Sequence, residues 1–357
     1  MIGVSLAAVF RQQAEACARL GSPMYADLCA GLADDLEAGG PTADVCADHV
    51  HLDRDAAPAL RLLGGLHARV LERSAGALAT FYPSVGGVWE PVGGLAAARG
   101  LLADEPGDLR RWLDRPPQTN EVGRATALVG GLLHLPAEFR RPLRLVEIGA
   151  SAGLLLRPDH LGFVDADGRR WGPPDASLVI EDAWSGARDL APWPDLVVRD
   201  RIGGDLDPID PTTSAGRLTL SAYTWPDQRA RWERLRGALR LAEQVPARVR
   251  RIGAGDLLEE VVDGARAEDR EGCATVVWHS VMRQYLPAEE DARVAAALDR
   301  GLAAATADAP FVHLALEPGE AAGGFEVRLR AAGPRRLEAT LGVAHPHGVP
   351  VRWDGRA

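Results

Sequence analysis

The segment that most constrains the fold is residues 144–156, an apolar run that contains an acid and passes into a glycine-bearing turn. The apolar residues around Glu147 are typical of a parallel strand that is buried on both faces. Gly149 and Gly153 permit a tight turn and a close approach of the backbone to a ligand. We therefore expect a strand, a turn and then a helix, which is the form of a nucleotide-cofactor loop.

Composition is that of a globular protein with a full hydrophobic core. The chain has 357 residues, of which 46% are hydrophobic, enough for one large domain or two unequal ones. No uninterrupted apolar run approaches the roughly 20 residues that span a bilayer, and the first residues lack the basic region of a secretory signal. We therefore expect a cytoplasmic protein that has no membrane partner.

Charged residues and cysteines exclude several classes of function. All 40 basic residues are arginine, which excludes a P-loop lysine, a Schiff base to pyridoxal phosphate and a lysine base. A net charge of -10 argues against nucleic acid as a partner. The four cysteines, Cys17, Cys29, Cys46 and Cys273, show no close paired spacing, so we do not expect a disulfide framework.

The pattern of apolar residues changes about a third of the way along the chain. In residues 1–135 apolar residues return every three or four positions, which predicts a helical domain. In residues 136–357 short apolar strands alternate with helices, which predicts an α/β domain with a parallel sheet. The turn signal Asp167-Gly168 indicates a hairpin inserted at about residues 160–195, and a long amphipathic helix is expected over residues 226–243.

Three acids follow three predicted strands, namely Glu147, Asp205 and Asp256. The carboxyl ends of neighbouring parallel strands lie at one edge of a sheet, where ligands bind. An ionised Asp205 can accept hydrogen bonds from the two hydroxyls of a ribose, and Asp256 can accept one from an adenine amino group. Taken singly, each acid is also explained as a helix cap or a solvated turn residue.

These residues resemble the motifs of class I S-adenosylmethionine (SAM) methyltransferases over residues 118–357. Glu147, Gly149 and Gly153 are similar to the first motif, residues 202–206 to the end of the second strand, and Asp256 with Leu257 to the adenine side. The resemblance implies an α/β fold, a Rossmann-like seven-stranded sheet that ends in an antiparallel hairpin, with an N-terminal helical domain. The sequence departs from the motifs in two ways: Ser151 replaces a glycine, and the 58 residues from Glu147 to Asp205 exceed the usual spacing of about 20.

The chain as a whole resembles a bacterial family, the domain of unknown function numbered 2332. The resemblance extends from end to end and rests on six motifs, which lie at residues 20–25, 82–87, 118–124, 146–153, 223–228 and 279–286.

Polar residues outside the glycine turn provide further candidates. Asn120 or Arg124 can reach the carboxylate of the SAM methionyl group, although a helix cap with a surface salt bridge explains the same residues. His279 follows an apolar strand and can act as a general base, with Gln284 and Tyr285 orienting a substrate. A buried histidine followed by the first turn of a helix is the alternative, and alignment alone can suffice for methyl transfer.

Two more groups of side chains have competing interpretations. Tyr223, Trp225 and Gln228 combine aromatic faces with polar ends and can line an acceptor pocket, or they can lead into the following helix. Cys46, His49 and His51 include zinc-ligand types, but a fourth ligand at a standard spacing is missing, so a polar loop is the better interpretation and no metal is expected.

Ser151 supports a rival function, because Gly149-Ala-Ser-Ala-Gly153 also has the G-x-S-x-G form of a hydrolase nucleophile elbow. An acid and a histidine would have to follow it, for example Asp256 with His279, His313 or His345. The long helical half before the turn argues against a hydrolase. We expect a SAM-dependent methyltransferase for a small-molecule acceptor, with oxygen or carboxylate acceptors favoured if His279 is a base. A serine esterase, or a noncatalytic module that binds SAM or a protein, is the alternative, and the sequence does not indicate the oligomeric state.

Overall fold

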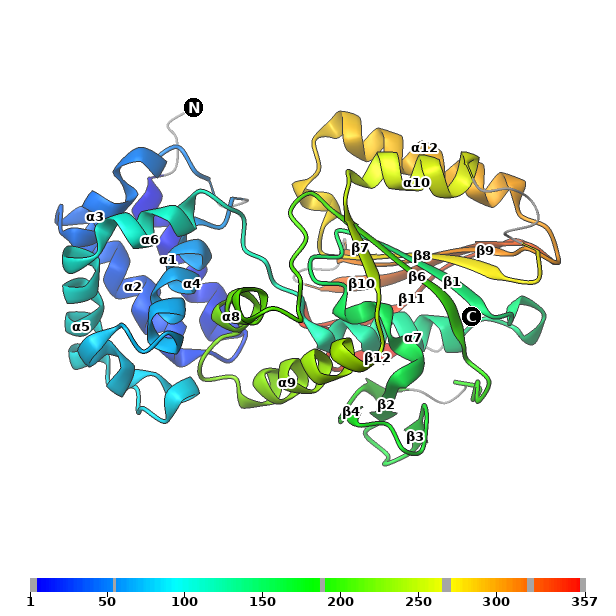
Figure 1. Ribbon diagram of the computed structural model, residues 1–357, viewed down its shortest axis with the longest axis horizontal. Coiled ribbons are helices and arrows are strands. Elements are labelled where there is room, and N and C mark those ends of the chain that lie inside the picture. The colour runs from blue at the N-terminus through cyan, green and yellow to red at the C-terminus, as the bar shows by residue number, and fades with distance from the viewer. Residues whose placement is uncertain (1–4, 54–55, 187–189, 265–270, 320–323, 354–357) are drawn as a thin grey trace. The chain divides into compact units, whose positions relative to one another are not determined.

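The computed structural model describes residues 5–53, 56–186, 190–264, 271–319 and 324–353. The chain divides into two compact units, each made of two stretches of sequence (Figure 1). The helical unit contains Met1–Thr119 and Thr213–Glu233, and the α/β unit contains Asn120–Thr212 and Arg234–Ala357. The boundary predicted from the sequence was at residue 135. The stretch from Asn120 belongs to the α/β unit, because the helix that follows it packs on the sheet.

The helical unit consists of α-helices joined by short turns. Its α-helices are α1 (Leu6–Arg19), α2 (Pro23–Glu37), α3 (Pro41–Cys46), α4 (Pro58–Leu71), α5 (Pro91–Asp104), α6 (Pro106–Leu113) and α8 (Ser214–Ala222). Its 3-10 turns are η1 (Ala47–His49), η2 (Gly76–Phe81) and η3 (Pro83–Val85). Helix α9 (Arg229–Gln244) begins in this unit and ends in the other, close to the limits predicted for the long amphipathic helix.

Local sequence explains where these helices start. Proline begins α2, α3, α4, α5 and α6, because its fixed φ and missing N–H suit the first position of a helix. Ser22 caps α2 by accepting a hydrogen bond from the amide of Tyr25, and Glu90 caps α5 in the same way. The apolar faces then enclose a core that includes Leu28, Leu62 and Leu66.

A nine-stranded sheet forms the centre of the α/β unit within the described residues. Across the sheet the strands are β5 (Trp184–Ser185), β12 (Val351–Trp353), β11 (Leu337–Ala344), β10 (Phe325–Ala332), β9 (Phe311–Pro318), β8 (Ala274–Ser280), β1 (Leu143–Ile148), β6 (Val198–Asp205) and β7 (Arg248–Arg251). The strands from β9 to β7 are parallel, and β10, β11 and β12 add antiparallel pairs. The implied seven-stranded sheet was therefore wrong in its strand number: the sheet is mixed and mostly parallel, and β5 and β12 extend one edge.

A second, three-stranded sheet lies between β1 and β6 in the sequence. It consists of β3 (Arg170–Trp171), β2 (Leu161–Val164) and β4 (Leu178–Ile180), in that order. Phe163 lies opposite Trp171, and Gly168 has a φ of 79° in the turn between them, so the expected hairpin is present. The rest of the predicted insertion includes residues 187–189, which lie outside the described residues, and β5, which pairs with β12.

Helices cover both faces of the large sheet (Figure 1). On one face α10 (Ala254–Asp263) and α12 (Ala288–Ala304) enclose a core with Val146, Ile148 and Val277. On the other face lies α7 (Ala125–Leu133), so close that a Cβ on its Gly131 would meet Leu314 of β9 at 2.6 Å. Short 3-10 turns connect these elements: η4 (Val122–Arg124), η5 (Ala137–Phe139), η6 (Leu154–Leu156), η7 (Pro158–His160) and η8 (Arg283–Tyr285).

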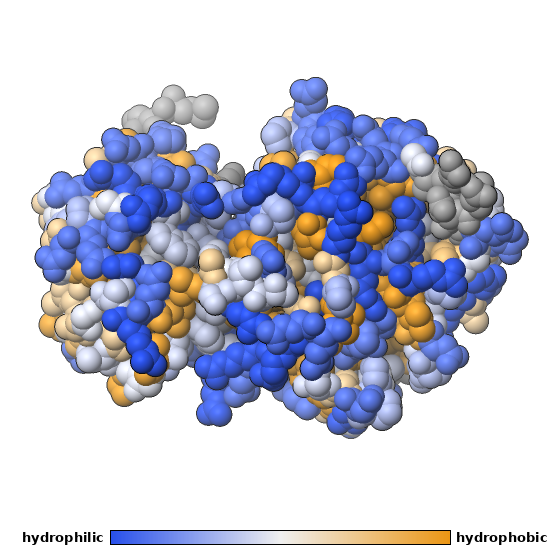
Figure 2. Space-filling view, in the orientation of Figure 1, coloured by the Kyte–Doolittle hydropathy of each residue, from blue (hydrophilic) through white to orange (hydrophobic). Residues whose placement is uncertain are grey.

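The surface of each unit is mixed in polarity, and the cysteines are buried. Figure 2 shows hydrophilic and hydrophobic residues interspersed on the face of each unit in view. Among the described residues no helix is both long and apolar enough to cross a membrane. Cys17, Cys29, Cys46 and Cys273 are all buried free thiols, so the prediction of no disulfide framework is confirmed.

Candidate functional site

The parallel strands reverse their order at β1, which identifies the candidate site. Counted along the chain, the five parallel strands β7, β6, β1, β8 and β9 lie in the order 3-2-1-4-5. The chain leaves β1 toward β6 on one side and later returns to β8 on the other. In open α/β sheets the crevice at such a reversal, beyond the carboxyl ends of the strands, is where ligands bind.

The loop after β1 has an alternating left-handed backbone. Gly149, Ser151 and Gly153 have φ values of 66°, 51° and 63°, and a serine in this region is uncommon. Side chains from two other segments hold the loop: Asp205 accepts a hydrogen bond from the Ser151 amide at 2.8 Å, and Asn120 accepts one from the Leu154 amide at 2.8 Å. The loop is therefore a fixed turn at the carboxyl end of the central strand.

The helix that we expected after this loop was a wrong prediction. Within the described stretch 149–164 the loop leads into two 3-10 turns, η6 and η7, and then into β2. Side chains occupy the backbone groups that a helix would use here, because Asn120 accepts from the Leu154 amide and Arg157 donates to the Gly153 carbonyl oxygen. The loop consequently offers no helix N-terminus to an anion, and it lacks the strand-turn-helix context of a nucleophile elbow.

Glu147 is a buried carboxyl beneath this loop. It is only 2% exposed, and its Oε2 has no hydrogen-bond partner among the residues that the structure describes. Burial raises its pKa well above the usual 4.5, the charge of Asp205 raises it further, and Arg124 and Arg157 oppose the rise. The site thus combines two acids on one sheet face with an unsatisfied oxygen, an arrangement that a cationic ligand group would stabilise.

Arg157 is a buried residue of the site that was not predicted from the sequence. This arginine is 3% exposed and donates hydrogen bonds to the carbonyl oxygens of Gly153 and Val245. Burial lowers its pKa to about 10. The signal in the sequence was a single arginine directly after three leucines, a position where a buried charge needs a structural reason.

A chain of three titratable side chains occupies the opposite sheet face, beside the same reversal. His279 of β8 contacts Glu317 (Nδ1 to Oε1, 2.7 Å) and His313 (Nε2 to Nε2, 2.9 Å), both from β9. Nδ1 of His279 donates to the carboxylate, so its Nε2 accepts from His313 when both rings are neutral. Burial lowers the pKa of His313 well below its usual value. His279 is fully buried with both nitrogens engaged, so it can influence a substrate only through its neighbours.

Backbone strain accompanies this chain of side chains. Val281, the residue after β8, has a φ of 54°, which is a genuine outlier for a β-branched residue. The next two amides, of Met282 and Arg283, point at Oε1 of Glu317 at 3.1 and 3.4 Å. His313 was predicted only as a possible histidine of the alternative hydrolase, and Glu317 was not predicted, because each lies inside an apolar strand.

The structure does not bring the remaining predicted residues of the α/β unit together into one site. Asp256 does not end a strand: β7 ends at Arg251, and Asp256 lies exposed in the first turn of α10, paired with Arg293. Leu257 is buried in the core. Arg124 donates to the carbonyl oxygens of Pro346 and Ser280. Gln284 and Tyr285 are exposed in η8.

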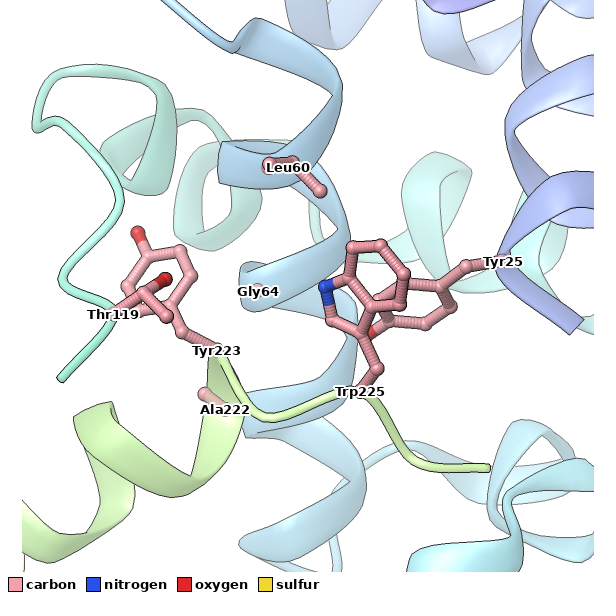
Figure 3. A pocket seen from close by; sticks show the side chains of 7 residues that line it. All are labelled: Tyr25, Leu60, Gly64, Thr119, Ala222, Tyr223 and Trp225. Atoms are coloured by element: carbon pink, nitrogen blue, oxygen red, sulfur yellow. The ribbon is translucent and has the colours of Figure 1, made fainter. Parts of the chain in front are cut away.

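Tyr223, Trp225 and Gln228 belong to the helical unit. Figure 3 shows Tyr223 and Trp225 on two sides of a pocket, with Tyr25 next to Trp225 and Gly64 behind. Its cavity volume of about 10 Å³ is barely enough for one water molecule and far below the roughly 300 to 1,000 Å³ of typical small-molecule sites. Gln228 instead donates to the Leu20 carbonyl oxygen.

Cys46, His49 and His51 also belong to the helical unit. Cys46 is buried, and burial raises the pKa of its thiol to about 12, which disfavours the thiolate that a metal requires. His49 contacts Asp114 at 2.9 Å. Among the described residues no group of three or more potential ligand side chains is placed to hold a metal ion.

The chain belongs to the family described as "Uncharacterized protein conserved in bacteria (DUF2332)", whose model matches residues 7–353. No curated protein and no solved structure matches it.

Proposed function

We propose that this family member is a SAM-dependent methyltransferase that acts on a small-molecule acceptor. The observation that carries the proposal is the fixed, left-handed glycine turn at the reversal of the 3-2-1-4-5 parallel strands, with Glu147 and Asp205 beneath it. That strand order resembles the central part of a class I methyltransferase sheet. The antiparallel strands β10 and β11 then extend it, as a terminal hairpin does in that fold.

The acidic side chains of the site are complementary in charge to this cofactor. SAM carries a sulfonium and an ammonium group, and the site offers two acids, one of which has a buried oxygen without a described partner. A positive group near Glu147 would favour its ionised form and so lower its raised pKa. When bound, SAM supplies a methyl group activated by the neighbouring sulfonium.

Each residue has a role that its surroundings allow. Asp205 uses its two oxygens to accept from the amides of Ser151 and Asp207, but a carboxylate has about four acceptor positions, so it can also accept from ribose hydroxyls. It is partly exposed, as such a role requires. Asn120 fixes the loop through its carbonyl oxygen, which leaves its amide group to donate to a carboxylate. Asp256 would have to share its carboxylate with Arg293 to bind an adenine amino group.

The chain of Glu317, His279 and His313 is suited to proton handling. Glu317 contacts Nδ1 of His279 and so orients its ring, and Nε2 of His279 contacts His313. Because burial lowers the pKa of His313, a proton taken up at its Nδ1 is released again readily, as a relay requires. This favours acceptors that lose a proton, such as hydroxyls or carboxylic acids. His279 is then a positioning residue, and a base is needed only if alignment does not suffice.

Calorimetry with SAM and S-adenosylhomocysteine tests the proposal. We expect both to bind the full chain, and we expect Asp205→Asn to weaken binding by about 1 to 3 kcal/mol, because hydrogen bonds to a charged acceptor are lost. Asp200→Asn is the matched control, since Asp200 lies exposed on the same strand. If neither ligand binds the folded protein at millimolar concentration, the cofactor assignment is wrong.

A further inference from the structure

A serine and a histidine in the helical unit contact each other, separate from the glycine loop. The Oγ of Ser84 lies 2.8 Å from Nε2 of His67, and Nδ1 of His67 lies 3.1 Å from the carbonyl oxygen of Ala222. A carbonyl oxygen only accepts, so Nδ1 carries the proton. Nε2 then has a free lone pair, and the Ser84 hydroxyl donates to it.

Packing holds the imidazole in this orientation. His67 lies on α4 and is completely buried. Its ring lies 5.3 Å from the ring of Tyr82 and 5.6 Å from that of Trp232. Burial lowers its pKa to about 3, so the ring is neutral over the whole physiological range. Geometry and tautomer are thus those of a general base that is oriented by a third group.

Ser84 itself lies at the surface. It is half-buried within η3, between Pro83 and Val85, both of which are exposed. Among the described residues seven large hydrophobic side chains are exposed, and three of them, Val85, Val88 and Val92, follow Ser84 within eight positions. A reactive hydroxyl that adjoins an apolar surface segment suits a substrate with an apolar acyl group.

We propose that Ser84 and His67 are a nucleophile and its base, and that they cleave activated esters or thioesters with apolar acyl groups. The amides of Gly86 and Gly87 are already bonded to the carbonyl oxygens of Pro83 and Tyr82, so they do not form an oxyanion hole. The substrates are therefore acyl compounds with good leaving groups, which need less stabilisation of the oxyanion.

The reaction proceeds in two balanced steps. The Ser84 Oγ forms a bond to the acyl carbon while its proton moves to Nε2 of His67. The bond from the carbon to the leaving oxygen or sulfur breaks, and His67 returns the proton to that atom. Water then attacks the acyl carbon and gives a proton to Nε2. Ser84 leaves and regains that proton, so a carboxylic acid is released and both residues are restored.

Labelling with a biotinylated fluorophosphonate, followed by peptide mapping, tests the proposal. We expect the label on Ser84, its loss in Ser84→Ala and its retention in Ser151→Ala, which removes the serine of the G-x-S-x-G segment. His67→Asn should slow labelling at least tenfold, with circular dichroism to confirm the fold. Hydrolysis of p-nitrophenyl butyrate should follow the same pattern across the variants.

The pH profile of labelling needs no variant and keeps the proposal testable if His67→Asn does not fold. His67 is neutral throughout the range from pH 5 to pH 8, so the rate of labelling should stay nearly constant over this range. A base with the ordinary histidine pKa of about 6.5 would lose about 30-fold at pH 5. A folded protein without label on Ser84, or with a rate that rises tenfold per pH unit as for an unassisted hydroxyl, would refute the proposal.

Discussion

Replacing Asp205 tests whether this side chain holds the glycine loop. Its carboxylate accepts from the amides of Ser151 and Asp207 at 2.8 and 2.9 Å. A hydrogen bond to a charged group contributes about 1.5 to 3 kcal/mol, and partial exposure favours the lower value. We therefore expect Asp205→Ala to lower the local opening free energy at these amides by about 3 kcal/mol, the sum of two bonds.

Hydrogen exchange resolved at single amides measures this effect. A loss of about 3 kcal/mol corresponds to exchange that is faster by about two orders of magnitude. The Leu154 amide, which bonds to Asn120, should change much less and serves as an internal control. In Asp205→Asn one acceptor oxygen remains, so about half of the effect is expected. Unchanged exchange at Ser151 and Asp207 in Asp205→Ala would show that the loop is held by other contacts.

Three further predictions concern buried groups. The native pKa of Glu147 is raised above its usual 4.5, so the native state keeps a proton that the unfolded state has lost, and stability falls as the pH rises above about 4.5; Glu147→Gln should remove that fall, as measured by urea unfolding at a series of pH values. Gly130→Ala should cost about 1 to 3 kcal/mol by overpacking, since its Cβ would lie 2.1 Å from Trp353; Gly100→Ala, with open space at its Cβ, is the control, and equal melting shifts would contradict the prediction. Tyr25→Phe should change stability by about 1 kcal/mol or less, because the buried hydroxyl has no described protein partner; a larger loss on thermal melting would reveal a hidden one.

Local sequence was sufficient where the structure depends on neighbouring residues. The strand before Gly149, the hairpin at Gly168 and the long helix α9 were predicted because an apolar run, a turn pair and helical periodicity are each readable within one segment. The 3-2-1-4-5 order of the parallel strands was not predicted, since pairing between distant strands has no local signal.

The polar residues were harder to predict than the strands. Asp256 was assigned to a strand end because it follows the predicted strand that begins at Val249, but Gly253 is the N-cap of α10, so the acid lies in the first turn of a helix. His313 and Glu317 lie on the same face of β9. Only the pairing of β9 with β8 brings them to His279. The bond between Ser84 and His67 likewise joins residues 17 positions apart.

The loop at Gly149 is held by residues far from it in sequence. Asn120 lies 34 positions before the amide it binds, and Asp205 lies 54 positions after the amide it binds. Folding has already fixed the backbone of this loop. A ligand that binds there would therefore lose less binding free energy to the ordering of the loop. Residues 143–156 grafted into another protein would lack Asn120 and Asp205. We therefore expect the grafted segment to keep its glycines but not the backbone conformation of the loop.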